Sequence, residues 1–171
     1  NKHITPFEHR WRMLETAVSN NPLFQLSDLE QKLSGKSYSV VTLTKLLETF
    51  HEDVDLYFLV GLDGFLELDT WWHYRQLFEL ARIVVVRRPG YCEKRLEEFL
   101  REKISADYER DDESGAFKHP QLLPVHTMKN TYLGISSTQI RRLVSDGRSI
   151  RYLVPADVMS YINNNKLYKV G

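Results

Sequence analysis

The residues that could carry chemistry gather in one stretch near the end of the chain, Gly134–Arg142. Ser136 and Gln139 have the Ser-x-x-Gln spacing of a capping box, which predicts a helix to about Ser145, with Gly147 placed to end it. The unpaired N–H groups and positive dipole end of such a helix start favour a phosphate. Further hydroxyl and guanidinium donors follow in the first turns, from Ser137, Thr138, Arg141 and Arg142. An ordinary capped surface helix with solvated arginines would have the same residues, so local physics leaves both interpretations open.

Two apolar runs, Leu56–Val60 and Ile83–Val86, have the continuous hydrophobic character of parallel strands covered on both faces. In an open α/β sheet, ligands gather beyond the carboxyl ends of the strands. Asp63 follows the first run, where its carboxylate can accept a hydrogen bond from a ribose hydroxyl or cap the next helix. Arg87 and Arg88 follow the second run and are expected to face the same cleft.

Aromatic residues are clustered in Thr70-Trp71-Trp72-His73-Tyr74. Because adjacent residues cannot share one helix face, at least one ring must point to a cleft or to solvent. A flat ring at a cleft is a stacking platform for a planar heterocycle, although core packing is the usual fate of Trp. Ser37-Tyr38-Ser39 precedes a predicted helix from about Val40 to Phe50, and taken alone these residues are most simply a helix cap.

The remaining pattern alternates helices and strands. A capping box, Thr5-Pro6-Phe7-Glu8, predicts a helix that Asn20-Asn21-Pro22 ends. Other helices are predicted at Cys92–Ile104 and Pro155–Asn164, and strands at Leu23–Leu26 and Leu122–Thr127. Within the polar stretch Asp107–His119, Asp111–Gly115 is predicted to be an exposed loop. This order favours an α/β fold with a parallel sheet.

Composition limits the partners. The chain has 171 residues, enough for one domain with a real core, and 23 basic side chains balance 23 acidic ones. No broad charge footprint for nucleic acid is visible, and no apolar run reaches the ~18 residues of a membrane helix. A single cysteine, Cys92, suits a reducing compartment. We therefore expect a cytoplasmic protein, monomeric or homodimeric, that binds neither nucleic acid nor membrane.

The residue order in Gly134–Arg142 is more specific than its capping box and donor groups alone. Ile135–Arg141 resembles the I-S-[SA]-T-x-I-R motif of the nicotinate-nucleotide adenylyltransferases. Other stretches resemble the same family in chain order: Ser37–Leu43 its S-Y-T-x-x-T-L pattern, Gly61–Asp63 its G-x-D, Thr70–Trp72 its [TK]-W-[YF], and Arg88–Tyr91 its R-P-G-Y. Ser39 replaces the usual Thr, and Trp72 replaces the usual Tyr or Phe. With Thr5–Arg10 and Gly147–Pro155, the resemblance spans essentially all 171 residues.

This resemblance implies a Rossmann-like parallel sheet with helices on both faces, in a single nucleotidyltransferase domain over residues 1–171. It implies an enzyme of NAD biosynthesis that joins nicotinate mononucleotide to ATP, with Mg²⁺ accompanying the ATP. Trp71 would stack on the pyridine ring, and the backbone amide of Trp72 would serve its carboxylate. The implied ATP-binding residues are Ser136, Ser137, Thr138, Arg141, Gly61 and Asp63; those for nicotinate mononucleotide are Ser39, Trp71, Trp72 and Arg88.

One motif of the superfamily does not occur in this sequence. It is [HT]-x-G-H, which polarises the ATP phosphates, so no catalytic residue can be assigned here. We expect the chain to lack a first strand, loop and helix of roughly 30 or more residues, and to be inactive by itself. Two alternatives remain open: a related nucleotidyltransferase with another acceptor, such as nicotinamide mononucleotide or phosphopantetheine, and a non-catalytic nucleotide-binding relative.

Overall fold

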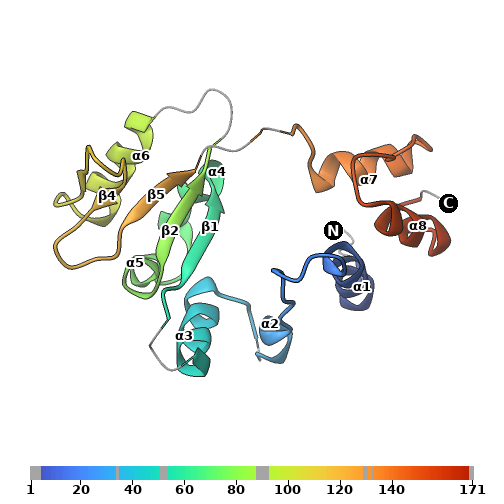
Figure 1. Ribbon diagram of the computed structural model, residues 1–171, viewed down its shortest axis with the longest axis horizontal. Helices are drawn as coiled ribbons and strands as arrows, with labels where there is room; N and C mark the ends of the chain where they lie inside the picture. The colour runs from blue at the N-terminus through green and yellow to red at the C-terminus, as the bar shows by residue number, and fades with distance from the viewer. Residues whose placement is uncertain are drawn as a thin grey trace. The chain divides into compact units, whose positions relative to one another are not determined.

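The computed structural model describes residues 5–33, 35–50, 54–87, 93–128, 131 and 133–169 (Figure 1). The chain forms two compact units, a helical unit of Asn1–Asp28 with Leu133–Gly171 and a sheet unit of Leu29–Tyr132. Each unit has a hydrophobic core of its own. The single domain expected over residues 1–171 stays a prediction.

The sheet unit is built on five strands in the order β1-β2-β5-β4-β3. Three of them run parallel: β1 (Tyr57–Gly61), β2 (Arg82–Val86) and β5 (Val125–Met128). Two short strands, β4 (Phe117–Lys118) and β3 (Glu109–Arg110), extend the sheet antiparallel to β5. Three of the four predicted strands, at Leu56–Val60, Ile83–Val86 and Leu122–Thr127, therefore form the parallel centre, and each begins within three residues of its predicted start.

Short helices join these strands. The α-helices are α2 (Leu29–Lys32), α3 (Ser39–Phe50), α4 (Leu62–Phe65), α5 (Leu77–Leu80) and α6 (Glu93–Phe99). Two 3₁₀ turns, η1 (Leu68–Thr70) and η2 (Tyr74–Gln76), flank the tryptophan pair, and α6 continues as a π-helical segment, η3 (Leu100–Ile104). The helix predicted from about Val40 to Phe50 is confirmed as α3.

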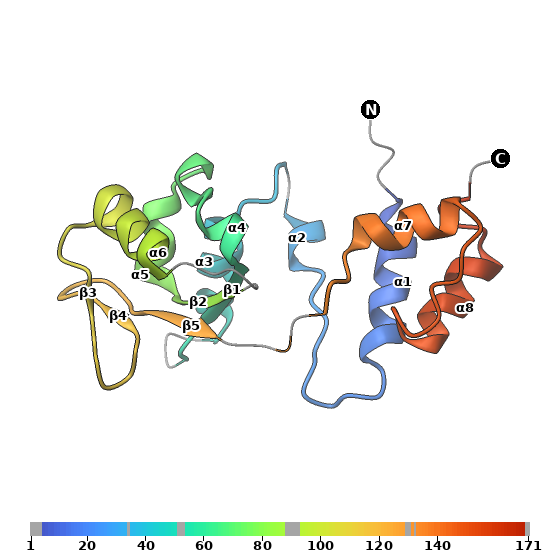
Figure 2. The ribbon, with the colours of Figure 1, turned by 90° about the horizontal axis from the view of Figure 1, so that it is seen from above.

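Helices α4, α5 and α6 of the sheet unit lie over one face of the sheet (Figure 2). Ile83, Val85 and Val125 point into the core on that face and are fully buried. Because side chains alternate along a strand, Tyr57 and Leu59 point to the other face, where they are 54% and 59% exposed. The predicted α/β fold with a parallel sheet is confirmed, whereas the described residues of this unit supply no helix layer for the second face.

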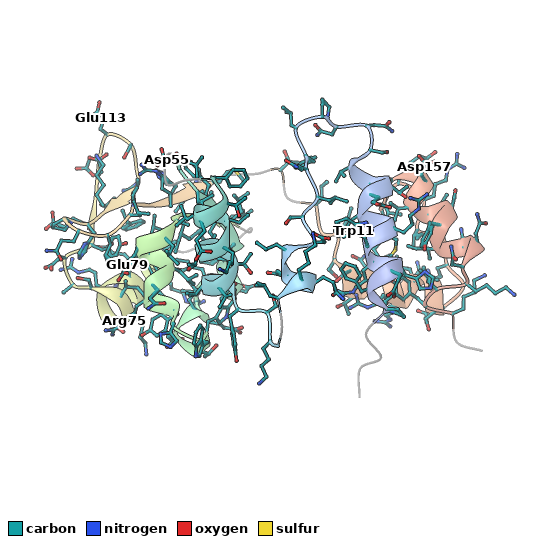
Figure 3. The ribbon with its side chains drawn as sticks, turned by 90° about the horizontal axis from the view of Figure 1, so that it is seen from below. Trp11, Asp55, Arg75, Glu79, Glu113 and Asp157 are labelled. Carbon is teal, nitrogen blue, oxygen red and sulfur yellow. The ribbon has the colours of Figure 1, made fainter. Side chains whose placement is uncertain are left out.

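The helical unit contains α1 (Phe7–Val18), α7 (Ser137–Ser145) and α8 (Ala156–Asn164). Its core is made by buried aliphatic side chains, namely Ile140, Val144, Ile150, Val158 and Ile162. His9 on α1 shares a 2.9 Å hydrogen bond between its Nδ1 and the Tyr161 hydroxyl on α8. Trp11, which Figure 3 labels on α1, donates from Nε1 to Glu15 Oε1 at 2.7 Å.

Two local predictions were wrong. Pro6 occupies the N-cap position of α1 and makes no side-chain capping bond, so the box predicted at Thr5 does not form. Leu23–Leu26 forms no strand, because it pairs with no neighbour and Leu23 and Phe24 are exposed. The loop predicted at Asp111–Gly115 is confirmed as the turn between β3 and β4, whereas these two short strands, which Phe117 anchors through its full burial, were not predicted.

Candidate functional site

A pocket of about 340 Å³ opens in the sheet unit beside the start of α3. Its walls come from the segment before α3, from α3 itself, from the turn between η1 and η2, and from α5. The lining residues are Ser37, Tyr38, Ser39, Val40, Thr70, Trp71, Trp72 and Leu77. Three residues that the sequence singled out, Ser39, Trp71 and Trp72, therefore meet in one pocket. Sequence reasoning missed Tyr38 and Leu77, whose positions depend on tertiary packing.

The pocket is lined by donors without formal charge. The Tyr38 carbonyl accepts from Thr42 N at 3.1 Å, which makes it the first acceptor of α3. The amides of Ser39, Val40 and Val41 lie in the first turn, where no intrahelical acceptor exists. No charged side chain of the described residues lines the pocket. A bound anion would thus be stabilised by the backbone N–H groups and the positive end of the α3 dipole instead of by a charged side chain.

The two tryptophans have different surroundings. Trp71 is half-buried: its ring packs against the core and lies edge-on to Phe58, with centroids 6.3 Å apart. Its amide donates to Leu68 O at 2.8 Å. Trp72 is 48% exposed, and its amide donates to no acceptor in the described part of the chain. Trp71 is therefore both a core residue and a pocket wall, and the two sequence interpretations of it are compatible.

The turn that carries both tryptophans is tied to the π-helical segment η3. The Tyr74 hydroxyl donates to Lys103 O at 3.2 Å, and Lys103 Nζ lies 3.2 Å from Asp69 Oδ2. Arg75, labelled in Figure 3, donates from Nε to the Tyr74 hydroxyl at 3.3 Å. These contacts fix both ends of the turn while leaving its middle, Trp72, facing outward.

The predicted phosphate-binding helix forms in the helical unit as α7. Ser136 is its N-cap, and Ser136 Oγ accepts from Gln139 N at 3.2 Å, as the capping box requires. At the other end Gly147 has φ +68°, with Arg148 N donating to Leu143 O at 2.8 Å. This is a Schellman ending, which needs a left-handed residue at the position of Gly147.

The exposed start of α7 carries the predicted donors. Arg141 Nη2 donates to Thr138 Oγ1 at 3.2 Å, so the hydroxyl proton of Thr138 is left for another acceptor. Ser136, Ser137 and Arg141 line a pocket of about 320 Å³ whose other walls are mainly apolar. Arg142 instead points along the helix, with its Nε 3.7 Å from Asp146 Oδ2.

The remaining predicted residues lie at the carboxyl ends of the strands. Gly61 ends β1 and is the N-cap of α4, and Asp63 is exposed in the first turn of α4. Asp63 is therefore inside a helix instead of capping one. At the end of β2, Arg87 N donates to Met128 O at 3.2 Å. Arg88 lies outside the described residues.

Across residues 5–169, apart from the undescribed gaps, no three His, Cys, Asp or Glu side chains gather in a group that would hold a metal ion. Over the same residues no helix is long and apolar enough to cross a membrane.

Comparison with known proteins identifies the family. The cytidylyltransferase-like family matches residues 1–143. The probable nicotinate-nucleotide adenylyltransferase of Geotalea uraniireducens is 40% identical over 162 residues, which cover 95% of this chain and 74% of the relative. That of Syntrophotalea carbinolica is 40% identical over 165 residues, covering 96% and 75%. The chain belongs to the nicotinate-nucleotide adenylyltransferase family. It spans about three quarters of the length of these relatives.

Solved structures agree on the fold of this adenylyltransferase family member. Nicotinic acid mononucleotide adenylyltransferase of Plasmodium falciparum, complexed with APC, aligns with a TM-score of 0.68 over 96% of this chain and 77% of its own. The same protein complexed with NaAD aligns with a TM-score of 0.69 over 98% and 76%. Both are 19% identical to this chain, so they support its nucleotidyltransferase fold and nothing finer.

Proposed function

We propose that this protein transfers an adenylyl group from ATP to nicotinate mononucleotide, giving deamido-NAD and pyrophosphate in NAD biosynthesis. The observation that carries this proposal is the pocket beside α3, where an aromatic wall adjoins first-turn backbone N–H groups, which have no acceptor within the helix. Family membership supports it, because the relatives at about 40% identity are named for this reaction.

The pocket would bind the pyridine ring of the acceptor. Trp71 offers a flat apolar surface whose orientation is set by core packing behind it. The first-turn amides of α3 and the amide of Trp72 would donate to the carboxylate. The hydroxyls of Ser37 and Ser39 are further donors at the same wall. Arg88, which lies outside the described residues, is proposed as a further contact of nicotinate mononucleotide.

The start of α7 would bind the ATP phosphates. Thr138 and Ser137 would donate hydroxyl protons, and Arg141 would supply a charge-assisted bond. Asp63, with Gly61 beside it, would accept from a ribose hydroxyl. Mg²⁺ would enter with the triphosphate, as part of the substrate.

The reaction needs no covalent enzyme intermediate. A phosphate oxygen of the mononucleotide attacks the α-phosphorus of ATP, the bond to the β-phosphate oxygen breaks, and pyrophosphate leaves with the electron pair. The protein would contribute alignment of the two phosphates and neutralisation of their charge. We further propose that the protein works in the cytoplasm as a monomer or homodimer, without nucleic-acid or membrane partners.

The test is the choice between acid and amide acceptors. A carboxylate accepts hydrogen bonds at both oxygens, whereas a carboxamide turns its NH₂ towards one donor and leaves that donor unpaired, at a cost of about 1–3 kcal/mol. We expect nicotinate mononucleotide to be preferred about ten- to a hundredfold in kcat/KM over nicotinamide mononucleotide.

Pyrophosphate release should be measured with ATP and each mononucleotide, using the protein as its gene encodes it. Equal use of both would overturn the donor-lined pocket, and release with neither would overturn the proposed reaction. Phosphopantetheine as a third acceptor distinguishes the related nucleotidyltransferases, since it has no ring to stack on Trp71.

A further inference from the structure

Two aromatic rings that line the pocket, from segments far apart in the sequence, contact each other. Tyr38 lies directly before α3, and Trp72 lies in the turn between η1 and η2. Their ring centroids are 4.8 Å apart with an interplanar angle of 32°. Both residues line the pocket, so this contact joins the wall that carries the helix amides to the wall that carries Trp71.

The position of Trp72 is fixed by an unusual backbone next to it. His73 has φ 51° and ψ 35°, in the left-handed region, which is strained for a residue other than glycine. The turn is held by Tyr74 N donating to Trp71 O at 3.3 Å and by Gln76 N donating to His73 O at 3.0 Å. The His73 ring then packs edge-on against Trp72, with centroids 4.0 Å apart. The His73 turn and the His73 ring thus hold the Trp72 ring against Tyr38.

Core packing does not explain this arrangement. Trp72 leaves 48% of its surface exposed and belongs to neither hydrophobic core, whereas Trp71 packs on the core of the sheet unit. A half-exposed ring outside both cores is better explained by the specific side chains that it contacts than by core burial. Here it touches Tyr38, whose carbonyl begins α3.

We propose that Tyr38 and Trp72 form an aromatic latch that sets the width of the acceptor pocket and so positions the pyridine ring against Trp71. This inference rests on the proposed function. Both residues act as positioning residues: they fix the spacing between the α3 amides and the Trp71 ring. Without the contact the two walls separate. The pyridine ring of the substrate then cannot stack on Trp71 while its carboxylate accepts hydrogen bonds from the α3 amides.

The test is a double-mutant cycle with Tyr38→Ala and Trp72→Ala, in the protein as its gene encodes it. An aromatic pair contributes about 0.5–1.5 kcal/mol, so each single variant should raise the KM for nicotinate mononucleotide about fivefold. The KM for ATP should stay within about twofold. The double variant should be little worse than either single one, because the contact can be lost only once. Trp72→Phe and Tyr38→Phe keep a ring and should recover most of the affinity.

Tyr152→Ala is the matched control, since Tyr152 is 85% exposed in the helical unit and contacts Arg151, not the pocket. If the increases in the KM for nicotinate mononucleotide of the two single variants multiply in the double variant, the latch is refuted. An equally large increase in the KM for ATP would also refute it. Near-UV circular dichroism without substrate tests the contact separately: Tyr38→Ala should alter the tryptophan signal while the melting temperature stays within a few degrees. A wild-type protein that makes no dinucleotide would refute the proposed function, and an unchanged spectrum would refute the latch even in an active enzyme.

Discussion

At the scale of single residues, charge and exposure separate side chains that look alike in the sequence. Arg141 and Arg142 are adjacent, yet Arg141 bonds Thr138 at the start of α7 while Arg142 turns back towards Asp146. Only Arg141 lines the pocket at the start of α7. The sequence could not make this distinction, because it depends on which face of α7 packs on the core.

The distinction predicts unequal effects of substitution. Arg141→Ala should raise the activation free energy for ATP use by about 2 kcal/mol, as expected for loss of a charge-assisted bond to phosphate. Arg142→Ala is the matched control and should change kcat/KM for ATP by less than about threefold, because an exposed i,i+4 ion pair contributes little. Steady-state kinetics with varied ATP would decide it. If kcat/KM for ATP decreases equally in the two variants, Arg141 has no specific contact with ATP.

At the scale of elements, local signals were predictable and tertiary ones were not. The capping box at Ser136 and the glycine at position 147 define α7 because their hydrogen bonds close within a few residues. By contrast, β3 and β4 lie in a charged stretch that predicts a loop; their pairing depends on Phe117 reaching the core and on the turn at Gly115, where φ is +68°. The Tyr38–Trp72 contact likewise joins segments that no sequence pattern links.

The open face of the parallel sheet carries a titratable group, His126 on β5. Burial lowers the pKa of His126 below its ordinary value of 6.5, and the positive charge of Arg82 lowers it further. The unfolded chain therefore binds more protons than the folded one as pH falls through 6.5, so stability decreases on acidification and is regained at higher pH.

We expect the urea concentration at the midpoint of unfolding to decrease when the pH is lowered from about 7.5 to about 5.5. The decrease should be smaller in His126→Gln, whose side chain cannot take up a proton. The comparison between about pH 8 and pH 9 is the internal control, since histidine does not titrate there. If the two proteins lose stability in parallel over the acid range, His126 is not the group responsible.

At the scale of the whole molecule, a net charge of zero conceals an uneven distribution. The helical unit carries nine Lys and Arg against five Asp and Glu, a net charge of +4; the sheet unit carries 14 against 18, a net charge of −4. The proposed ATP phosphate site is on the positive unit and the proposed acceptor pocket is on the negative one. The Debye length grows from about 8 Å at physiological salt to about 30 Å at 0.01 M, so the charge of the unit that carries a site acts on its ligand mainly at low ionic strength.

This asymmetry predicts opposite effects of salt on the two substrates. Raising NaCl from about 0.05 M to 0.3 M should raise the KM for ATP severalfold, because screening weakens attraction to the basic unit. The KM for nicotinate mononucleotide, also an anion, should fall or stay constant, because screening relieves repulsion from the acidic unit. Lys166→Glu and Arg10→Glu change the field of the helical unit without touching α7, and should flatten the ATP response while leaving kcat at saturation within about twofold. Potassium acetate in place of NaCl controls for specific chloride binding. A parallel rise of both KM values with salt would mean that charges in direct contact, not the fields of the two units, govern how both substrates bind.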